Sequence, residues 1–317
     1  TTISFEYGFT KSYDSTLSIS GTISGSATLY KEVQLKNLIP GRTYHFRVKA
    51  VNASGTSYGQ DFTFNTSKNF GSSHSAAHTV VVNTDGVVFA YGYNVTGQLG
   101  DNTTSHKYVP YKVLKGAYNG TTYLGDNTSS PIIAVSAGIF HTIALAADGS
   151  VYTFGTNKNG QIGDNTSTDR YTPVRVLKGD YNGTTYLGDN SANPIIAVSA
   201  GSYHSLALAA DGTVYAFGYN SFGQIGDSST TDRRVPAKVL MGGYKGNRYL
   251  GDNSNNPIVS ISAGGTHNMV LSAEGLVYSF GDNTYGQLGD STNTTRLTPV
   301  KVLKGSHPGT RYLGDNK

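Results

Sequence analysis

The sequence predicts an all-β protein whose larger part is built of repeated, stacked sheets. One stretch, residues 138–164, occurs four times, and its histidine falls at His78, His141, His204 and His267, a constant offset of 63 residues. An internal period of this size indicates one supersecondary unit stacked on copies of itself. The composition agrees, because 40 glycines, 23 tyrosines and only 14% charged residues are typical of a turn-rich β protein.

Each copy contains a hairpin signal, which is Asp148-Gly149 in the second copy. A two-residue turn needs positive φ angles, which Asp and Gly tolerate best. Such a turn predicts one face with large pairs and one with small pairs: Leu145 with Tyr152 and Ile143 with Phe154, opposite Ala144 with Thr153 and Ala146 with Val151. Both apolar faces must be covered, so the large face of one copy is expected to pack on the small face of the next. Sheets stacked in this way around an axis form a β-propeller.

Residues 1–66 do not share the repeat, residues 67–77 read as a polar linker, and residues 78–317 contain the repeats. The first segment has five strand-like runs, at residues 3–7, 16–20, 32–38, 43–52 and 60–66. Residues 38–55 resemble the late strands of a fibronectin type III domain, with Tyr44 at the place of its corner tyrosine. Because such a domain has seven strands, we expect either a partial domain or one that another chain completes by adding a strand.

Each copy also carries an insert with a second hairpin signal, at Asn119-Gly120, Asn182-Gly183, Lys245-Gly246 and Pro308-Gly309. We expect this insert to project as a β-arm that carries tyrosines, namely Tyr118, Tyr123, Tyr181, Tyr186, Tyr244, Tyr249 and Tyr312. Exposed tyrosines are effective contact residues. The alternative is that each tyrosine packs against the sheet that the insert leaves.

The repeated pattern joins Ala-Gly, His, an Ala/Leu strand, Asp-Gly, Val-Tyr, aromatic-Gly, Asn and Gly-Gln-Ile/Leu-Gly. It resembles the repeat of the regulator of chromosome condensation (RCC1) family, whose members form seven-bladed β-propellers. The resemblance spans residues 71–317. Tyr91, Phe154, Phe217 and Phe280 stand where the family usually has Trp, and the inserts lengthen each copy. The chain holds four copies, fewer than the family's ring requires.

Both ends of the repeat array look incomplete. Residues 131–135, 194–198 and 257–261 are apolar strands that open a copy, but the corresponding residues 68–72 are polar. The chain also stops where another such strand would begin. These matching gaps predict that strand exchange between chains could complete the array.

The four repeated histidines carry no second ligand at short spacing, which argues against a zinc site. The resemblance implies instead that His78, His141, His204 and His267 are structural, and the tight-turn glutamines Gln98, Gln161, Gln224 and Gln287 are expected to tie neighbouring backbone. The repeated Asp-Asn pairs lack the pattern of a calcium loop and fit turns better. No catalytic triad, phosphate loop or dinucleotide motif stands out, so we expect no enzyme activity and no cofactor.

Charge and apolar content exclude some further classes of protein. The net charge of +4 comes without a basic stripe, which argues against nucleic-acid binding. No apolar stretch is long enough to span a membrane, and the chain has no cysteine.

The residues at the loop tips differ between copies, while those at scaffold positions are the same. We therefore expect the tips to form a protein-binding face. The residues that we expect to make contact are Phe140, Tyr203, Tyr219, Phe222 and Tyr285. We therefore predict a non-enzymatic extracellular or cell-surface structural and interaction protein of a prokaryote, with other protein chains, including copies of itself, as partners. It would self-assemble into surface filaments by strand exchange. The alternative is a dedicated binder or inhibitor of one protein, with a single recognition face.

Overall fold

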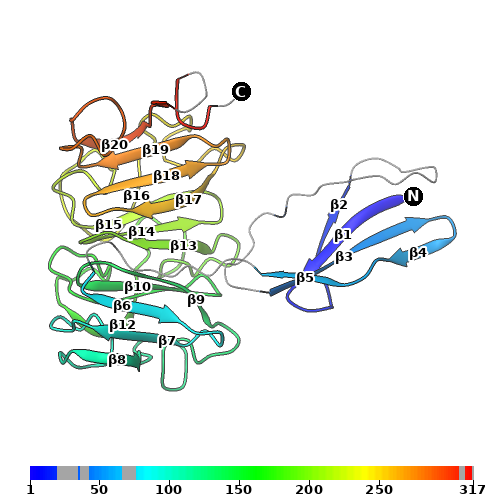
Figure 1. Ribbon diagram of the computed structural model, residues 1–317, viewed down its shortest axis with the longest axis horizontal. Coiled ribbons are helices and arrows are strands. Elements are labelled where there is room, and N and C mark those ends of the chain that lie inside the picture. Colours follow the sequence, from blue (N-terminus) through cyan, green and yellow to red (C-terminus); the bar gives the residue numbers. More distant parts are fainter. Residues whose placement is uncertain (20–34, 36–42, 66–75, 307–310, 316–317) are drawn as a thin grey trace. The chain divides into compact units, whose positions relative to one another are not determined.

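The computed structural model describes residues 1–19, 35, 43–65, 76–306 and 311–315 (Figure 1). Contacts divide the chain into two compact units, Thr1–Lys68 and Asn69–Lys317. Every regular element within these described ranges is a β-strand, so the predicted all-β class is confirmed. Most of the predicted linker, residues 67–77, lies outside the described residues.

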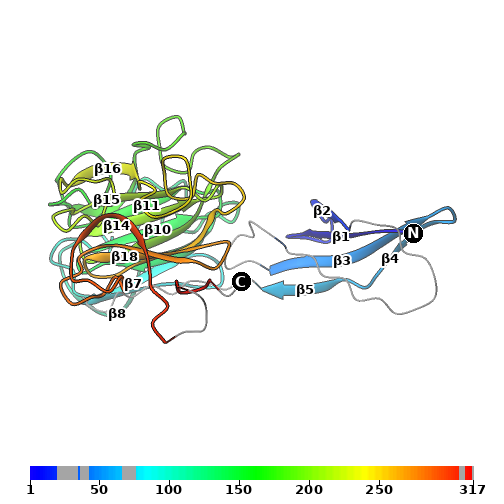
Figure 2. The same cartoon turned by 90° about the horizontal axis from the view of Figure 1, so that it is seen from above.

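The first unit is one antiparallel sheet (Figures 1 and 2). Its strands are β1 (Thr2–Gly8), β2 (Ser15–Ser18), β3 (Thr43–Asn52), β4 (Gly55–Tyr58) and β5 (Phe62–Asn65), in the order β2-β1-β3-β4 with β5 also paired to β3. Tyr44 is buried at 5% exposure against the ring of Phe9, 4.8 Å away. The predicted run at residues 32–38 falls almost wholly outside the described ranges, and the fibronectin resemblance stays a prediction.

The second unit contains four small antiparallel sheets, one for each copy of the repeat (Figure 1). The first sheet has β6 (His78–Val82), β7 (Val88–Gly92) and β8 (Lys107–Lys112), and the second has β9 (Ile132–Ala137), β10 (His141–Ala146), β11 (Val151–Gly155) and β12 (Arg170–Arg175). The third has β13 (Ile195–Ala200), β14 (His204–Ala209), β15 (Val214–Gly218) and β16 (Arg233–Lys238). The fourth has β17 (Ile258–Ala263), β18 (His267–Ser272), β19 (Val277–Gly281) and β20 (Arg296–Lys301).

The four sheets follow one another as propeller blades do, and over the described residues they do not close into a ring. Sheets two to four each hold four strands in meander order, whereas the first holds three described strands. The place of its predicted missing strand, residues 68–72, lies outside the described part of the chain.

The predicted hairpin register is wrong by one residue in every copy. In the second sheet Ala144 lies opposite Tyr152 and Leu145 opposite Val151. The turn holds three residues, because the N–H of Ala146 bonds the carbonyl of Ser150 at 2.9 Å and Gly149 adopts a φ of 89°. A tight turn followed by one left-handed glycine is the common three-residue hairpin loop.

The corrected register changes what each face presents. Tyr152 shares its face with Ala144, so large and small side chains alternate within a face instead of being separated onto two faces. The aromatic rings of the second sheet still pack on small residues of the first: Tyr152 and Phe154 lie in one buried cluster with Val80, Val88 and Ala90. Both faces of the inner sheets are therefore covered, as predicted, by an interdigitated contact.

The inserts do not project as β-arms. Each of the first three folds back as a compact loop whose only ladder contact in the described residues is a single bridge, such as that between Leu114 and Tyr123. In these three inserts the first tyrosine is buried and meets a tyrosine of the next sheet edge to face: Tyr118 on Tyr152 at 5.4 Å, Tyr181 on Tyr215 at 5.6 Å and Tyr244 on Tyr278 at 5.6 Å. The inserts are therefore part of the joint between neighbouring sheets.

An aspartate closes each of the first three insert loops. Asp126 accepts hydrogen bonds from the backbone N–H groups of Thr121, Thr122 and Tyr123 at 2.7–2.9 Å. Burial by itself would raise the pKa of this carboxyl, but the hydrogen bonds outweigh it and lower the pKa to about 2. The aspartate of the Gly-Asp-Asn pattern thus stabilises its own loop by accepting backbone hydrogen bonds.

We predict that Tyr181→Ala lowers the free energy of unfolding by about 3 kcal/mol, because it empties a buried aromatic site and removes the hydroxyl bond to the Asn193 carbonyl, 2.6 Å long. Tyr285→Ala is the matched control, since Tyr285 is 92% exposed and should change stability by less than about 0.5 kcal/mol. Denaturant titration of both variants measures the difference. Equal stabilities would show that the inserts do not hold the sheets together.

Candidate functional site

Six aromatic side chains form a continuous row across the first three sheets, which we call the aromatic row: His106, Tyr93, Phe140, Tyr203, Tyr219 and Phe222. The centroids of successive rings lie 4.8, 5.7, 6.2, 6.5 and 6.2 Å apart. These separations are within the usual range for contacting aromatic pairs.

The aromatic row lies at one end of the sheets. Phe140 and Tyr203 directly precede β10 and β14, while Tyr93 and Tyr219 directly follow β7 and β15. In an antiparallel hairpin the start of one strand and the end of its partner meet at the same end. Backbone bonds fix these positions, because the carbonyl of Phe140 accepts the N–H of Thr156 at 2.8 Å and that of Tyr203 accepts the N–H of Tyr219 at 2.9 Å.

Four of the five predicted contact residues belong to the aromatic row: Phe140, Tyr203, Tyr219 and Phe222. The fifth, Tyr285, lies apart from it, 92% exposed and with no ring contact in the described part of the chain. The reason is that Thr266 and Asp282 occupy, in the fourth copy, the positions of Tyr203 and Tyr219.

Sequence reasoning did not select Tyr93 and His106. A signal for Tyr93 exists, because it occupies the same position in the first copy that Tyr219 occupies in the third. His106 has no such counterpart, since Asp169 and Asp232 stand at its position in the next two copies. Its ring stacks on Tyr93 at 25° between planes, a contact that only the folded loop creates.

The aromatic row combines accessible rings with a polar border. Phe222 is 36% exposed and the rings of Tyr93, Phe140, Tyr203 and Tyr219 are half-buried. At the positions of Tyr219 and Phe222 the second copy has Thr156 and Asn159, and the side-chain amide of Asn159 donates to the Asp232 carboxylate at 2.9 Å. A rigid apolar patch with a satisfied polar edge is the composition of a protein-interaction surface.

The repeated histidines lie behind this surface and join neighbouring sheets. Nε2 of His78 lies 2.8 Å from the hydroxyl of Thr142, and that hydroxyl donates to the carbonyl of Gln98 at 3.0 Å. Since the hydroxyl proton is used on the carbonyl, Nε2 must carry its proton and donate it to Thr142. The second sheet thus inserts one polar group between a histidine and a glutamine of the first.

The same relay recurs at the next two joints. His141 donates to Ser205 at 3.0 Å, and Ser205 donates to the carbonyl of Gln161 at 3.1 Å. His204 donates to the Oδ1 of Asn268 at 2.7 Å, and the amide of Asn268 donates to the carbonyl of Gln224 at 2.7 Å. The relay therefore accepts Thr, Ser or Asn as long as the group can both accept and donate.

Each glutamine side chain hydrogen-bonds the backbone of the turn in which that glutamine lies, and so it also fixes the glutamine's own backbone carbonyl. Oε1 accepts the backbone N–H two residues earlier: Thr96 for Gln98, Asn159 for Gln161, Phe222 for Gln224 and Tyr285 for Gln287, at 2.8–3.0 Å. Because Phe222 belongs to the aromatic row, this bond also fixes one end of the candidate surface.

Burial keeps the three relay histidines neutral. It lowers the pKa of His78 to about 4, that of His141 to about 3 and that of His204 to about 4. Neighbouring histidines contribute further to the lowering at His141. In unfolded chains the pKa is near 6.5, so these groups bind protons only when the joints open.

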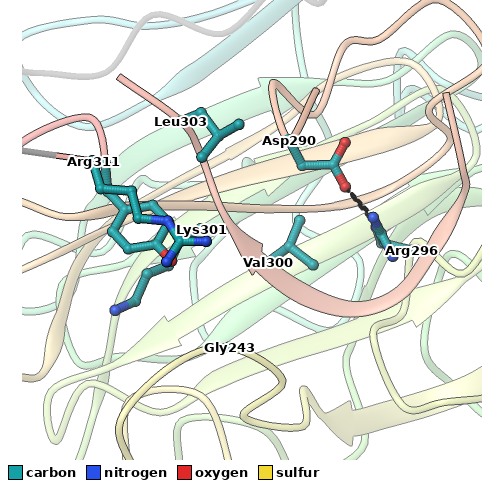
Figure 3. Close-up of a pocket in the computed structure, with 8 residues that line it drawn as sticks. Gly243, Asp290, Arg296, Val300, Lys301, Leu303 and Arg311 are labelled. Atoms are coloured by element: carbon teal, nitrogen blue, oxygen red, sulfur yellow. Dashed lines mark hydrogen bonds and ion pairs between the residues drawn. The ribbon is translucent and has the colours of Figure 1, made fainter. Parts of the chain in front are cut away.

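A second candidate, a shallow pocket of about 350 Å³, lies beside β20 (Figure 3). Asp290 pairs there with Arg296 at 2.6 Å, and Lys301 and Arg311 both lie over the ring of Tyr312. The same pairs recur in earlier copies: Asp227 with Arg233, Asp164 with Arg170, and Lys238 and Arg248 over Tyr249. The pocket residues thus belong to the repeated scaffold, in which the Asp290 carboxylate is paired with Arg296 and the cations of Lys301 and Arg311 lie over the Tyr312 ring.

Within the described ranges there is no group of three or more His, Asp or Glu side chains placed to hold a metal ion. The described residues also include no helix long and apolar enough to cross a membrane.

We predict that stability falls as the pH drops from 6.5 toward 5.5. The folded pKa of each relay histidine is depressed, so the unfolded state binds more protons below pH 6.5 and is favoured by about 1.4 kcal/mol per pH unit for each fully titrating group. Denaturant titrations across this range measure the slope. His141→Gln should reduce the slope by about one proton; an unchanged slope would contradict the assignment of this histidine as buried and neutral.

Residues 61–312 match the RCC1-like domain family. The ultraviolet-B receptor UVR8 of Arabidopsis thaliana is 31% identical over 226 residues, covering 71% of this chain and 44% of that protein. The RCC2 homolog of Danio rerio is 29% identical over 251 residues, covering 74% of this chain and 46% of that protein. The chain therefore spans less than half the length of these relatives.

Solved structures show the same fold at low sequence identity. Human WBSCR16 aligns with a TM-score of 0.59 at 20% identity, covering 78% of this chain and 57% of that chain. Yeast RCC1 (Prp20) in complex with Kap60 aligns with a TM-score of 0.51 at 17% identity, covering 83% and 59%. The repeat match, the histidine relays at each joint and the stacked sheets lead to one conclusion: the chain belongs to the RCC1-like domain family.

Proposed function

We propose that the repeat unit is a non-enzymatic protein-binding module and that the aromatic row contacts its partner. The observation that carries this proposal is the placement of Tyr93, Phe140, Tyr203 and Tyr219 side by side at one end of three sheets. Aromatic side chains bring large contact area at low entropic cost and dominate the binding energy of many interfaces. The hydrogen bonds that fix their backbone reduce the ordering cost of binding further.

Two features of the fold favour a protein over a small molecule as the partner. The aromatic row extends across several sheets, whereas the pocket beside β20 is shallow and lined by residues of the repeated scaffold, and its carboxylate, Asp290, is already paired with Arg296. A protein partner is also supported by the solved structure of Kap60 bound to yeast RCC1 (Prp20), in which a protein of similar fold is in complex with another protein.

An extracellular or cell-surface location stays part of the proposal, together with a structural role there. Its support is the fibronectin-like pattern in residues 38–55, since domains of that kind are common on cell surfaces. The alternative of a dedicated inhibitor uses the same aromatic row and differs only in the identity of the bound protein.

Partner binding tests the proposal. Affinity purification with the whole chain as bait identifies a partner, and calorimetry with the purified partner then compares variants. Phe140→Ala, Tyr203→Ala and Tyr219→Ala should each weaken binding by about tenfold, because each ring contacts two others in the row.

Tyr285→Ala serves as the control, since Tyr285 is a tyrosine of the same end of the molecule outside the row. Its affinity for the partner should stay within about twofold of the original chain. Undiminished binding by the combined Phe140, Tyr203 and Tyr219 variant would remove the aromatic row as the binding surface.

A further inference from the structure

One corner of the aromatic row, in the third copy, differs from its counterparts in the other copies. Two positions define it: the residue directly after β7, β11, β15 or β19, and the residue directly before β8, β12, β16 or β20. They are Tyr93 and His106 in the first copy, Thr156 and Asp169 in the second, Tyr219 and Asp232 in the third, and Asp282 and Thr295 in the fourth. Only the third copy combines an aromatic ring with a carboxylate.

The second of these positions holds the same backbone group in the first and third copies. Nδ1 of His106 accepts the N–H of Asn94 at 3.0 Å, and a carboxylate oxygen of Asp232 accepts the equivalent N–H, that of Asn220, at 2.8 Å. The imidazole and the carboxylate therefore occupy equivalent places beside the row. In the first copy this place puts a planar group on the ring of Tyr93, with 4.8 Å between centroids and 25° between planes.

The ring of Tyr219 has no such stacked group. Its ring contacts within the described ranges are with Tyr203, at 6.5 Å and 74°, and with Phe222, at 6.2 Å and 69°, and both are edge to face. No lysine or arginine in the described part of the chain lies over it. The face of an aromatic ring carries the negative end of its quadrupole and attracts cations.

Asp232 adds a negative charge that no cation balances. Among the described residues its oxygens accept hydrogen bonds from neutral donors, a backbone N–H and the side-chain amide of Asn159, and it forms no ion pair, not even with Arg234 two residues on. The equivalent Asp169 in the second copy pairs with Lys158 at 3.7 Å. A carboxylate can accept about four hydrogen bonds, so Asp232 retains capacity for a further donor.

We infer that this corner of the row is a cation subsite that receives an arginine side chain of the partner protein, an inference that rests on the proposed function. The subsite consists of Tyr203, Tyr219, Phe222 and Asp232. A guanidinium is planar, so it stacks on Tyr219 as the imidazole of His106 stacks on Tyr93. Its fork of N–H groups then donates to the Asp232 carboxylate in a charge-assisted contact.

The two contacts together select arginine among side chains. A lysine ammonium is a compact charge without a plane, so it cannot combine stacking with a forked hydrogen bond. Aspartate, glutamate or a phosphate group would bring like charge to Asp232, which is unfavourable. A neutral aromatic side chain could stack on Tyr219 but would leave the carboxylate without a cation.

Peptide selection with the whole chain tests the inference. A phage-displayed library of random peptides is selected on the original chain and counter-selected on the double variant Tyr203→Ala, Tyr219→Ala, so that the retained peptides depend on the aromatic row. These peptides should carry an arginine. Replacing that arginine by citrulline, which has the same shape without the charge, should weaken binding in calorimetry by about tenfold.

Two variants of the chain locate the effect. Asp232→Asn should weaken binding of the arginine peptide by about tenfold, and on this variant citrulline should cost less than about threefold, because both changes remove the same contact. Asp169→Asn is the matched control, since its carboxylate already pairs with Lys158 and Thr156 stands there in place of a ring. It should bind the peptide within about twofold of the original chain. Circular dichroism establishes that all variants are folded.

The outcomes separate this inference from the proposed function. Retained peptides without arginine, an arginine that tolerates replacement by citrulline or lysine, or equal effects of Asp232→Asn and Asp169→Asn would overturn the cation subsite and leave the aromatic row as the binding surface. If counter-selection removes every peptide, the row itself is not the binding surface, and the subsite falls with it.

Discussion

The buried imidazole at each joint constrains the rest of the repeat unit. His78, His141 and His204 are almost fully removed from water, and a buried N–H without an acceptor costs free energy comparable to a lost hydrogen bond. The next sheet must therefore place a hydroxyl or amide at one defined point, and that group must return a hydrogen bond to the glutamine carbonyl. The relay fixes the separation and the rotation of neighbouring sheets. Tertiary packing of Tyr152 and Phe154 on the preceding sheet then completes the same joint.

The joint depends on the relay and on the packing of buried rings, and this explains why the residues at the loop tips can vary. Because the relay and the glutamine-held turns set the backbone, the side chains at positions such as those of Phe140 and Tyr203 can differ from copy to copy. The aromatic row is the result of that freedom in three neighbouring copies. The fourth copy has Thr266 and Asp282 at the corresponding positions, so the row ends there although the scaffold continues.

The inserts carry a local hairpin signal but fold into compact loops. The predicted hairpin turns at Asn119-Gly120, Asn182-Gly183 and Lys245-Gly246 do not form: the left-handed glycine is Gly116, Gly179 or Gly242 instead, and the flanking residues do not pair into a projecting ladder. The fourth signal, Pro308-Gly309, lies outside the described residues. The reason is energetic, since Tyr118 gains more by burial against Tyr152 than it would as an exposed ring, and Asp126 satisfies the loop backbone that a ladder would otherwise satisfy. Tyr118, Tyr181 and Tyr244 therefore pack inward, but their ring partners lie on the next sheet and not on the sheet that the insert leaves, as the alternative had it.

The sequence alone determined the all-β class, the 63-residue repeat, the family and four members of the aromatic row, because these depend on periodicity and on residues that recur at fixed positions. Only the tertiary structure decided the hairpin register and the adjacency of the rings. Register depends on whether Ala147 belongs to the strand or to the turn, and the choice between two and three turn residues rests on a single backbone bond, from Ala146 to Ser150. Adjacency of Phe140 and Tyr203 depends on how sheets stack, and that of His106 and Tyr93 depends on how the loop between β7 and β8 folds. Local sequence patterns encode neither contact.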